Sequence, residues 1–228
     1  MTHLPFEDRR EAGRLLAAEL ARRDLGHNAV VLALTRGGVP VGFAVADRLH
    51  LPLDIIVARK LGVPWQPELA MGAIAGKTRI LDDRMIRELG IADEDVEAIV
   101  EREQAEMKRR EELYRGGNPA LGLSRKSAIL VDDGLATGNT MVAAVRHVRS
   151  LHPARVIVAV PVGSKQASNH LRKEADEVVC LAIPEIFYAV GEWYRDFRQI
   201  SDAEVCDLLR ESRLQMSKHP VSEHPVSI

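Results

Sequence analysis

Short, predominantly apolar runs recur along the chain, and segments of mixed polarity separate them. The runs cover residues 29–34, 53–58, 127–133, 155–162 and 177–183. Apolar runs of this length without polar alternation are typical of strands buried on both faces. Helical patterns at 39–49, 139–151 and 165–174 separate most of the runs. This alternation predicts an α/β fold in which a parallel sheet of about five strands is flanked by helices.

Two regions interrupt the alternation of strands and helices. Residues 61–82 contain two prolines and three glycines, which predicts a loop followed by a hairpin. Residues 92–117 are rich in charge and end at a Gly pair, which predicts one long helix with a solvated face. We assign no ligand to that helix.

The two ends of the chain differ in pattern. Apolar positions on one face predict a helix within residues 6–23, and a further helix within 202–214. We therefore expect one domain over residues 1–214. Residues 215–228 include the repeated tetrapeptide HPVS and lack an apolar face, so a disordered tail is expected there.

Composition excludes several classes of protein. Apolar residues make up 46% of the 228 residues, and 31 Lys and Arg nearly balance 33 Asp and Glu, which leaves a net charge of −2. This balance does not favour nucleic acid or a membrane surface as a partner. No apolar run approaches the ~20 residues of a membrane span, and the N-terminus lacks the apolar region of a signal peptide. Since Cys180 and Cys206 form no CxxC pair, a cytoplasmic location is expected.

The candidate chemistry lies in "ILVDDGLATGNT", residues 129–140. An apolar strand here ends in Asp132 and Asp133 and leads into a Gly/Thr-rich turn that precedes a predicted helix. Converging backbone N–H groups, the positive end of the helix and Thr hydroxyls make such a turn a candidate phosphate site. Gly138 would permit a close approach or a positive φ that a side chain would forbid.

Other interpretations of this turn fit less well. The segment has no Lys after its second Gly, as a Walker-type loop would, and "TRGGVPVG" after the first strand is not a dinucleotide fingerprint. A surface turn capped by Asn139 or Thr140 is the simplest alternative. The two aspartates favour a ligand that presents hydroxyl groups near its phosphate. A sugar phosphate has that arrangement.

The segment 129–140 resembles the phosphoribosyl diphosphate (PRPP) motif of type I phosphoribosyltransferases, in order and in spacing. The "GEWYRDF" segment further resembles bacterial proteins that carry a phosphoribosyltransferase domain. The resemblance spans about residues 28–200 and implies the type I phosphoribosyltransferase fold with a small C-terminal hood, mainly 182–202. It also implies contacts to the PRPP 5-phosphate from Ala136, Thr137, Gly138, Asn139 and Thr140.

The resemblance also implies roles for acidic and basic residues. Asp132 and Asp133 would hold the ribose hydroxyls, directly or through Mg²⁺, and with Arg36 they are the expected catalytic residues. Since the turn "TRGG" is similar to the family's diphosphate loop, the expected diphosphate ligands are Arg36, Gly37, Gly38, Arg59 and Lys60. A plain turn at 35–38 and solvent-facing side chains at 59 and 60 are the alternatives.

Two further segments would act on the acceptor. Residues 61–77 correspond in position to a mobile lid, with Glu68 as one possible general base. In the hood, Tyr188 and Trp193 are candidate acceptor contacts, as is Lys165 after the preceding strand, although hood aromatics can simply pack. Asp196 lies one residue beyond the position of the corresponding acid in purine enzymes, which leaves the acceptor open.

The resemblance implies transfer of ribose 5-phosphate from PRPP to a nitrogen nucleophile, such as a nucleobase, with Mg²⁺ as cofactor and diphosphate as leaving group. A homodimer is common in the family. Two alternatives remain: a PRPP sensor or regulator without turnover, and an α/β domain that binds another sugar phosphate. Arg36, Arg59 and the loop of lid length favour the enzyme.

Overall fold

The central element of the computed structural model is a five-stranded parallel sheet. The structure describes residues 4–26 and 28–218. The strands of this sheet are β1 (Val30–Leu34), β2 (Leu53–Ile56), β6 (Ser127–Val131), β7 (Arg155–Val162) and β8 (Glu177–Ala182). They lie in the order β2-β1-β6-β7-β8, and every neighbouring pair is parallel. The predicted fold class is confirmed.

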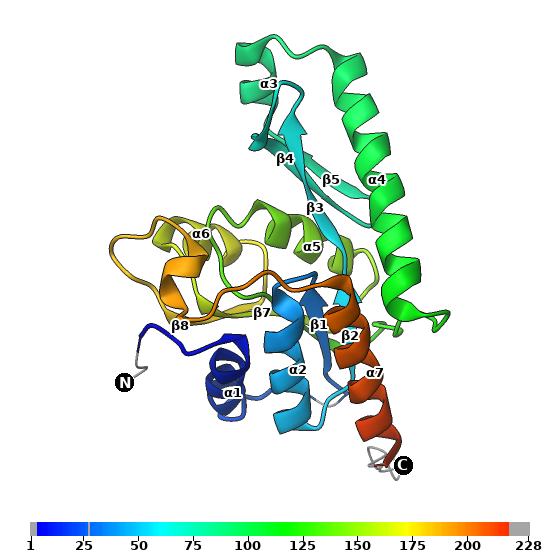
Figure 1. The fold of residues 1–228 in the computed structure, drawn as a ribbon, viewed down its shortest axis with the longest axis vertical. Helices are drawn as coiled ribbons and strands as arrows, with labels where there is room; N and C mark the ends of the chain where they lie inside the picture. The colour runs from blue at the N-terminus through cyan, green and yellow to red at the C-terminus, as the bar shows by residue number, and fades with distance from the viewer. Residues whose placement is uncertain (1–3, 27, 219–228) are drawn as a thin grey trace.

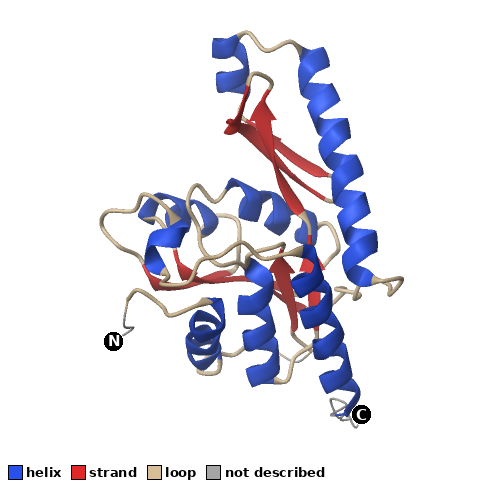
Figure 2. Cartoon of the chain, in the orientation of Figure 1, coloured by secondary structure: helices blue, strands red, loops and turns tan. Residues whose placement is uncertain are grey.

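Helices cover both faces of this sheet, as Figures 1 and 2 show. One face packs against α1 (Arg9–Leu20), α2 (Gly38–Leu49) and α7 (Asp202–Lys218), and the other packs against α5 (Asn139–Arg149) and α6 (Lys165–Leu171). Every residue of β1 and β6 is buried. A strand covered on both faces has no polar side to show in its sequence, which explains the continuous apolar runs.

A second unit is inserted between β2 and β6 and projects from the central sheet in Figure 1. It contains the antiparallel strands β3 (Ala58–Val63), β4 (Gln66–Ala75) and β5 (Thr78–Leu81), followed by α3 (Asp83–Leu89) and α4 (Asp93–Arg115). The predicted long helix is confirmed as α4. The prediction of a loop followed by a hairpin was incomplete, because residues 61–77 lie almost entirely in β3 and β4 rather than in an open loop.

Small residues explain why β4 was hard to recognise. A Cβ atom at Gly72 would lie 2.3 Å from the Ile80 carbonyl oxygen, and one at Gly62 would lie 2.3 Å from the Pro67 carbonyl oxygen. Glycine at these positions therefore reflects close approach between strand backbones. In the sequence the same glycines indicated a loop.

The predicted hood, residues 182–202, runs between β8 and α7 with a single 3₁₀ turn, η1 (Val190–Trp193). The N-terminal segment holds it in place. The Phe6 backbone N–H donates to the Trp193 carbonyl oxygen over 2.8 Å, and the Phe6 and Tyr194 rings lie 5.4 Å apart. Tyr194 of the hood thus packs on a segment from the other end of the chain, as the simpler alternative for the hood aromatics expected.

The C-terminal helix is longer than predicted. Residues 215–218, expected in the tail, continue α7. The HPVS repeat lies in 219–228, outside the described residues. None of the helices in the described part of the chain is long and apolar enough to cross a membrane.

Candidate functional site

The two aspartates stand at the carboxyl end of β6, where open α/β sheets place their ligands. The Asp133 backbone N–H donates to Asp132 Oδ1 over 2.9 Å, and both residues are partly buried. The Tyr194 hydroxyl donates to the Asp133 carbonyl oxygen over 2.6 Å. The hood therefore contacts the backbone of Asp133 through Tyr194.

Arg9, which the sequence analysis did not predict as a site residue, forms an ion pair with Asp133. Its Nε donates to Asp133 Oδ2 over 2.9 Å, and one of its terminal nitrogens donates to the Arg198 carbonyl oxygen over 2.9 Å. The Arg9 guanidinium lies 3.9 Å from the centre of the Phe197 ring, and the residue is only 7% exposed. A buried arginine from α1 thus neutralises one of the two predicted site carboxylates.

Burial perturbs both carboxyl groups. It raises the pKa of Asp132 well above the ordinary value, and the charge of Asp133 raises it further. Burial also raises the pKa of Asp133, although the Arg9 guanidinium opposes this shift. Carboxylates held in an unfavourable environment at a sheet edge are typical of functional sites.

The predicted phosphate turn lies directly after this pair. Gly138 has a φ of +81° and is the N-cap residue of α5. Because glycine has no side chain, no side-chain hydrogen bond caps this helix. Since the first N–H groups of a helix have no partner within it, those at the start of α5 are available to an anion. Ala136 and Thr137 are exposed, and Asn139 and Thr140 are half-buried.

Contacts to the next strand hold this turn in position. The Ser164 hydroxyl donates to the Ala136 carbonyl oxygen over 2.7 Å, and the Leu135 N–H donates to the Val162 carbonyl oxygen over 2.9 Å. The turn is therefore an ordered element of the sheet edge. A preformed cradle of this kind suits a fixed phosphate group.

The predicted diphosphate turn meets the aspartates directly. A Cβ atom at Gly37 would lie 2.1 Å from Asp133 Oδ2, and one at Gly38 would lie 2.7 Å from the Val131 carbonyl oxygen and 2.9 Å from the Asp132 Cα. Only glycine permits this approach between the turns after β1 and β6. The structure thus brings together two segments that lie nearly a hundred residues apart in the chain.

Arg36 reaches across this edge toward α7. A terminal nitrogen of Arg36 lies 3.4 Å from Asp202 Oδ1. The Thr35–Arg36 peptide is cis. Within the described residues, Thr35 Oγ1 is buried and makes no hydrogen bond. The turn thus holds a cationic side chain and an unsatisfied hydroxyl.

The other predicted diphosphate residues are placed differently. Arg59 lies on β3 of the inserted unit, where it contacts Glu103 Oε2 of α4 at 2.7 Å. Lys60 is exposed. Neither lines the pocket that Arg36 and Gly37 share with Asp133.

The acceptor candidates lie on the hood side. Lys165 is exposed at the start of α6, and Tyr188 is 80% exposed. Trp193 packs against Phe187 with 6.3 Å between ring centres. Its indole nitrogen is buried and finds no hydrogen-bond partner in the described chain.

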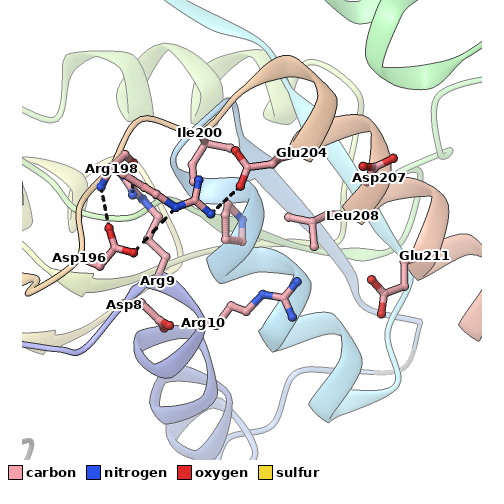
Figure 3. Close-up of a pocket in the computed structure, with 11 residues that line it drawn as sticks. Asp8, Arg9, Arg10, Asp196, Arg198, Ile200, Glu204, Asp207, Leu208 and Glu211 are labelled. Carbon is pink, nitrogen blue, oxygen red and sulfur yellow. Dashed lines mark hydrogen bonds and ion pairs between the residues drawn. The ribbon is translucent and has the colours of Figure 1, made fainter.

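Two pockets meet at Arg9. One, of about 340 Å³, lies between the hood and the glycine turn and is lined by Arg9, Arg36, Gly37, Asp133, Phe197, Gln199 and Ile200. Figure 3 shows the second, of about 310 Å³, between α1, α2 and α7. Arg198 spans its edge, 2.6 Å from Glu204 and 3.8 Å from Asp196. Asp196 is therefore at the rim of the second pocket and outside the lining of the first.

Comparison with known proteins shows which family the chain belongs to. The model of the phosphoribosyl transferase domain matches residues 7–198. The chain belongs to this family. The resemblance noted from residues 129–140 is thereby confirmed.

Relatives agree with this assignment. The chain is 46% identical over 205 residues to two Mycobacterium tuberculosis proteins, from strains CDC 1551 and H37Rv, each named "Putative phosphoribosyl transferase". The match covers 90% of this chain and 46% of each relative, so the chain spans about half the length of these curated relatives.

Solved structures match over nearly the whole chain. TT1426 from Thermus thermophilus is 42% identical, with a TM-score of 0.76 over 91% of this chain and 99% of that one. A hypothetical protein from Neisseria gonorrhoeae with bound ppGpp shares the fold at 13% identity, with a TM-score of 0.50 over 93% and 100% of the chains.

The candidate site has few metal ligands of its own. No group of three or more His, Cys, Asp or Glu side chains within residues 4–26 and 28–218 could hold a metal ion. Asp132 and Asp133 supply carboxylate oxygens at the ligand edge. Mg²⁺ commonly binds through one or two carboxylates together with phosphate oxygens and water, so this donor set fits Mg²⁺ carried in by a diphosphate ligand.

Proposed function

We propose that this member of the phosphoribosyl transferase domain family transfers ribose 5-phosphate from PRPP to a nitrogen nucleophile and releases diphosphate. The observation that carries the proposal is the contact between the glycine turn at 37–38 and the aspartate pair at 132–133. It supports a single ligand with a diphosphate at one turn and a ribose 5-phosphate at the other. PRPP is such a ligand.

The groups at the edge suit each part of PRPP. The start of α5, with Thr137 to Thr140, would bind the 5-phosphate through backbone N–H and hydroxyl donors. The Asp132 and Asp133 carboxylates would accept hydrogen bonds from the ribose hydroxyls. Mg²⁺, held by these carboxylates and the diphosphate, would offset the charge of the leaving group.

The reaction breaks the bond between C1 of the ribose and the diphosphate oxygen and forms a bond from C1 to nitrogen. Diphosphate leaves with the electron pair, and the nucleophile loses its proton to solvent or to a base. Positive charge that develops at C1 would be stabilised by the nearby carboxylates, and negative charge on the diphosphate by Arg36 and the Gly37 and Gly38 amides.

Calorimetric titration with PRPP and Mg²⁺, followed by measurement of diphosphate release across a panel of nucleobases, tests the proposal. Binding with release for one base is the expected result and names the acceptor. Binding without release for any base would favour a PRPP sensor. No binding would contradict the assignment of this site.

A double variant tests the residues. Asp133→Asn combined with Thr137→Ala should abolish PRPP binding, because it removes a ribose contact and a 5-phosphate contact together. Circular dichroism on the same sample checks that the variant is folded, since Asp133 also pairs with Arg9. A folded double variant that binds PRPP like the parent would show that the ligand lies elsewhere.

A further inference from the structure

Three segments of the chain meet at one carboxylate oxygen next to the proposed diphosphate site. Arg36 of the glycine turn lies 3.4 Å from Oδ1 of Asp202, the first residue of α7. The Tyr114 hydroxyl, from α4, donates to the same oxygen over 2.7 Å. The inserted unit therefore reaches the site through α4.

The charges of this cluster are well defined. The hydrogen bond from Tyr114 lowers the pKa of Asp202, and the charge of Arg36 lowers it further, so Asp202 is ionised at neutral pH. Burial raises the pKa of Tyr114 far above its ordinary value, so the hydroxyl keeps its proton and remains a donor. An anion at the first turn of a helix is also favoured by the helix dipole.

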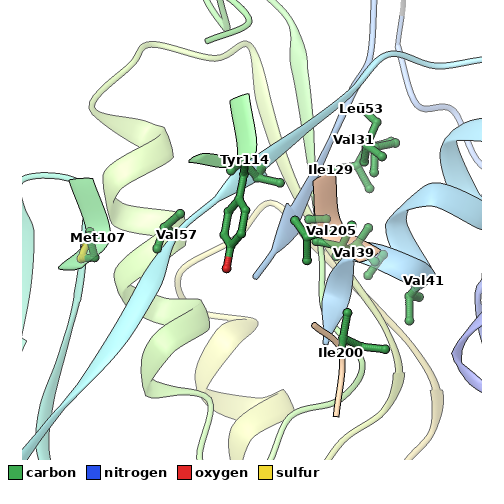
Figure 4. Close-up of a cluster of buried hydrophobic side chains, with 14 of the residues drawn as sticks. Val31, Val39, Val41, Leu53, Val57, Met107, Tyr114, Ile129, Ile200 and Val205 are labelled. Atoms are coloured by element: carbon green, nitrogen blue, oxygen red, sulfur yellow. The ribbon is translucent and has the colours of Figure 1, made fainter. Parts of the chain in front are cut away.

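Tyr114 is held rigidly. It is 1% exposed, and Figure 4 shows its ring among apolar side chains that include Val57, Val205 and Met107. Its hydroxyl therefore marks a fixed point in the core. Asp202 is partly exposed but is fixed by that hydroxyl, whereas Arg36 has a long side chain with considerable rotational freedom in isolation.

We propose that Tyr114 and Asp202 are positioning residues that orient the Arg36 guanidinium toward the leaving diphosphate. The inference rests on the proposed function. An arginine already restricted by Asp202 loses less side-chain freedom when it binds diphosphate. Asp202 and Tyr114 do not touch the ligand, and act only through Arg36.

Separate titrations with inorganic diphosphate and ribose 5-phosphate, both with Mg²⁺, test this inference. Asp202→Asn should weaken diphosphate binding about fivefold to tenfold and leave ribose 5-phosphate binding unchanged. Tyr114→Phe should weaken diphosphate binding about threefold. Since Tyr114 acts through Asp202, the double variant should match Asp202→Asn alone.

Asp207→Asn is the matched control, because Asp207 is exposed on the same helix and pairs only with Arg210 within the described chain. It should change neither affinity. Asp202→Ala is a second route if Tyr114→Phe does not fold.

Equal losses for both ligands would indicate a merely structural role and overturn the inference. Tighter diphosphate binding by Asp202→Asn would also overturn it, because Asp202 would then compete with diphosphate for Arg36. If the parent binds PRPP and the variants are unchanged, only the positioning role fails. If the parent binds neither ligand, the proposed function fails as well.

Discussion

The edge of the five-stranded sheet and helix α4 both place carboxylates beside arginines, but the consequences differ. At the sheet edge, two adjacent carboxyl groups share one close arginine, Arg9. On α4, Glu106 alone accepts from both Arg109 and Arg110, at 2.7 and 2.6 Å. Two carboxyl groups therefore lie beside one close arginine at the sheet edge, whereas two arginines bind one carboxylate on the helix.

The pKa values move in opposite directions as a result. Burial raises the pKa of both Asp132 and Asp133. Hydrogen bonds from Arg109 and Arg110 lower the pKa of Glu106 to about 2. The lowered pKa of Glu106 stabilises the native state at neutral pH, whereas the buried charges of Asp132 and Asp133 oppose it. The contrast separates a binding edge from a structural helix.

Among single substitutions, the largest effect on PRPP binding is expected from Asp132→Asn. PRPP affinity should fall about 100-fold, because a carboxylate that accepts from hydroxyls is replaced by a weaker neutral acceptor. Stability at pH 7 should instead rise by roughly 1 kcal/mol, because a buried charge with a raised pKa is removed. Calorimetry and urea unfolding measure the two quantities.

The pH dependence gives an internal check on that variant. Because the folded-state pKa of Asp132 lies above the unfolded value, its protonation stabilises the parent protein as pH falls through the folded-state pKa toward the ordinary value of 3.8. Asp132→Asn should lose this gain. A variant less stable than the parent at pH 7 would contradict the account of the sheet edge.

Arg9→Met should destabilise the protein by about 3 kcal/mol, because it leaves the buried Asp133 carboxylate without its partner. Urea unfolding at pH 7 measures the change. Arg10→Met is the neighbouring control: Arg10 is exposed and its guanidinium lies 5.4 Å from the centre of the Phe43 ring, so its loss should cost no more than about 1 kcal/mol. Similar costs for the two variants would show that Arg9 does not hold the site together.

Glu103→Gln addresses the inserted unit. Glu103 is 8% exposed and pairs with Arg59, so the variant should lose about 2 kcal/mol of stability. Ribose 5-phosphate affinity, measured by calorimetry, should not change. A loss of that affinity would place the inserted unit in direct contact with the sugar site.

The smallest effect is expected for Glu106→Gln. A lowered pKa stabilises the native state above the ordinary value of 4.5, and this contribution disappears as pH falls through about 2. Because the ion pairs of Glu106 are partly solvated, the loss at pH 7 should stay below about 1 kcal/mol. The free energies of unfolding of parent and variant should converge as pH falls toward 2. A difference that stays constant with pH would indicate that Glu106 contributes through packing and not through its charge.

Much of the central sheet could be predicted because doubly buried strands leave a simple pattern. The aspartates and the turn at 136–140 were also accessible, since they follow one such strand within a single segment. β3 and β4 were not recognised as paired strands, because Gly62 and Gly72 indicate a loop locally but serve close backbone contact in the folded chain. That contact depends on residues in neighbouring strands.

No sequence pattern predicted that Arg9 and Asp202 contact the candidate site. Each occupies the first position of a helix with an ordinary amphipathic pattern, and Asp133 and Arg36 are their partners, 124 and 166 residues away. The helix periodicity concerns burial of a face, and it carries no information on which distant charge a polar residue will meet.

The sequence by itself determined the alternation of buried strands and helices, and the order of groups along residues 129–140, because both depend on neighbours in the chain. The tertiary structure alone decided which cation meets Asp133, which carboxylate meets Arg36, and how far Arg59 lies from the glycine turn. Those contacts depend on where α1, α7 and the inserted unit lie relative to the central sheet. Burial and the new charged neighbours then shift the pKa values of Asp133 and Asp202.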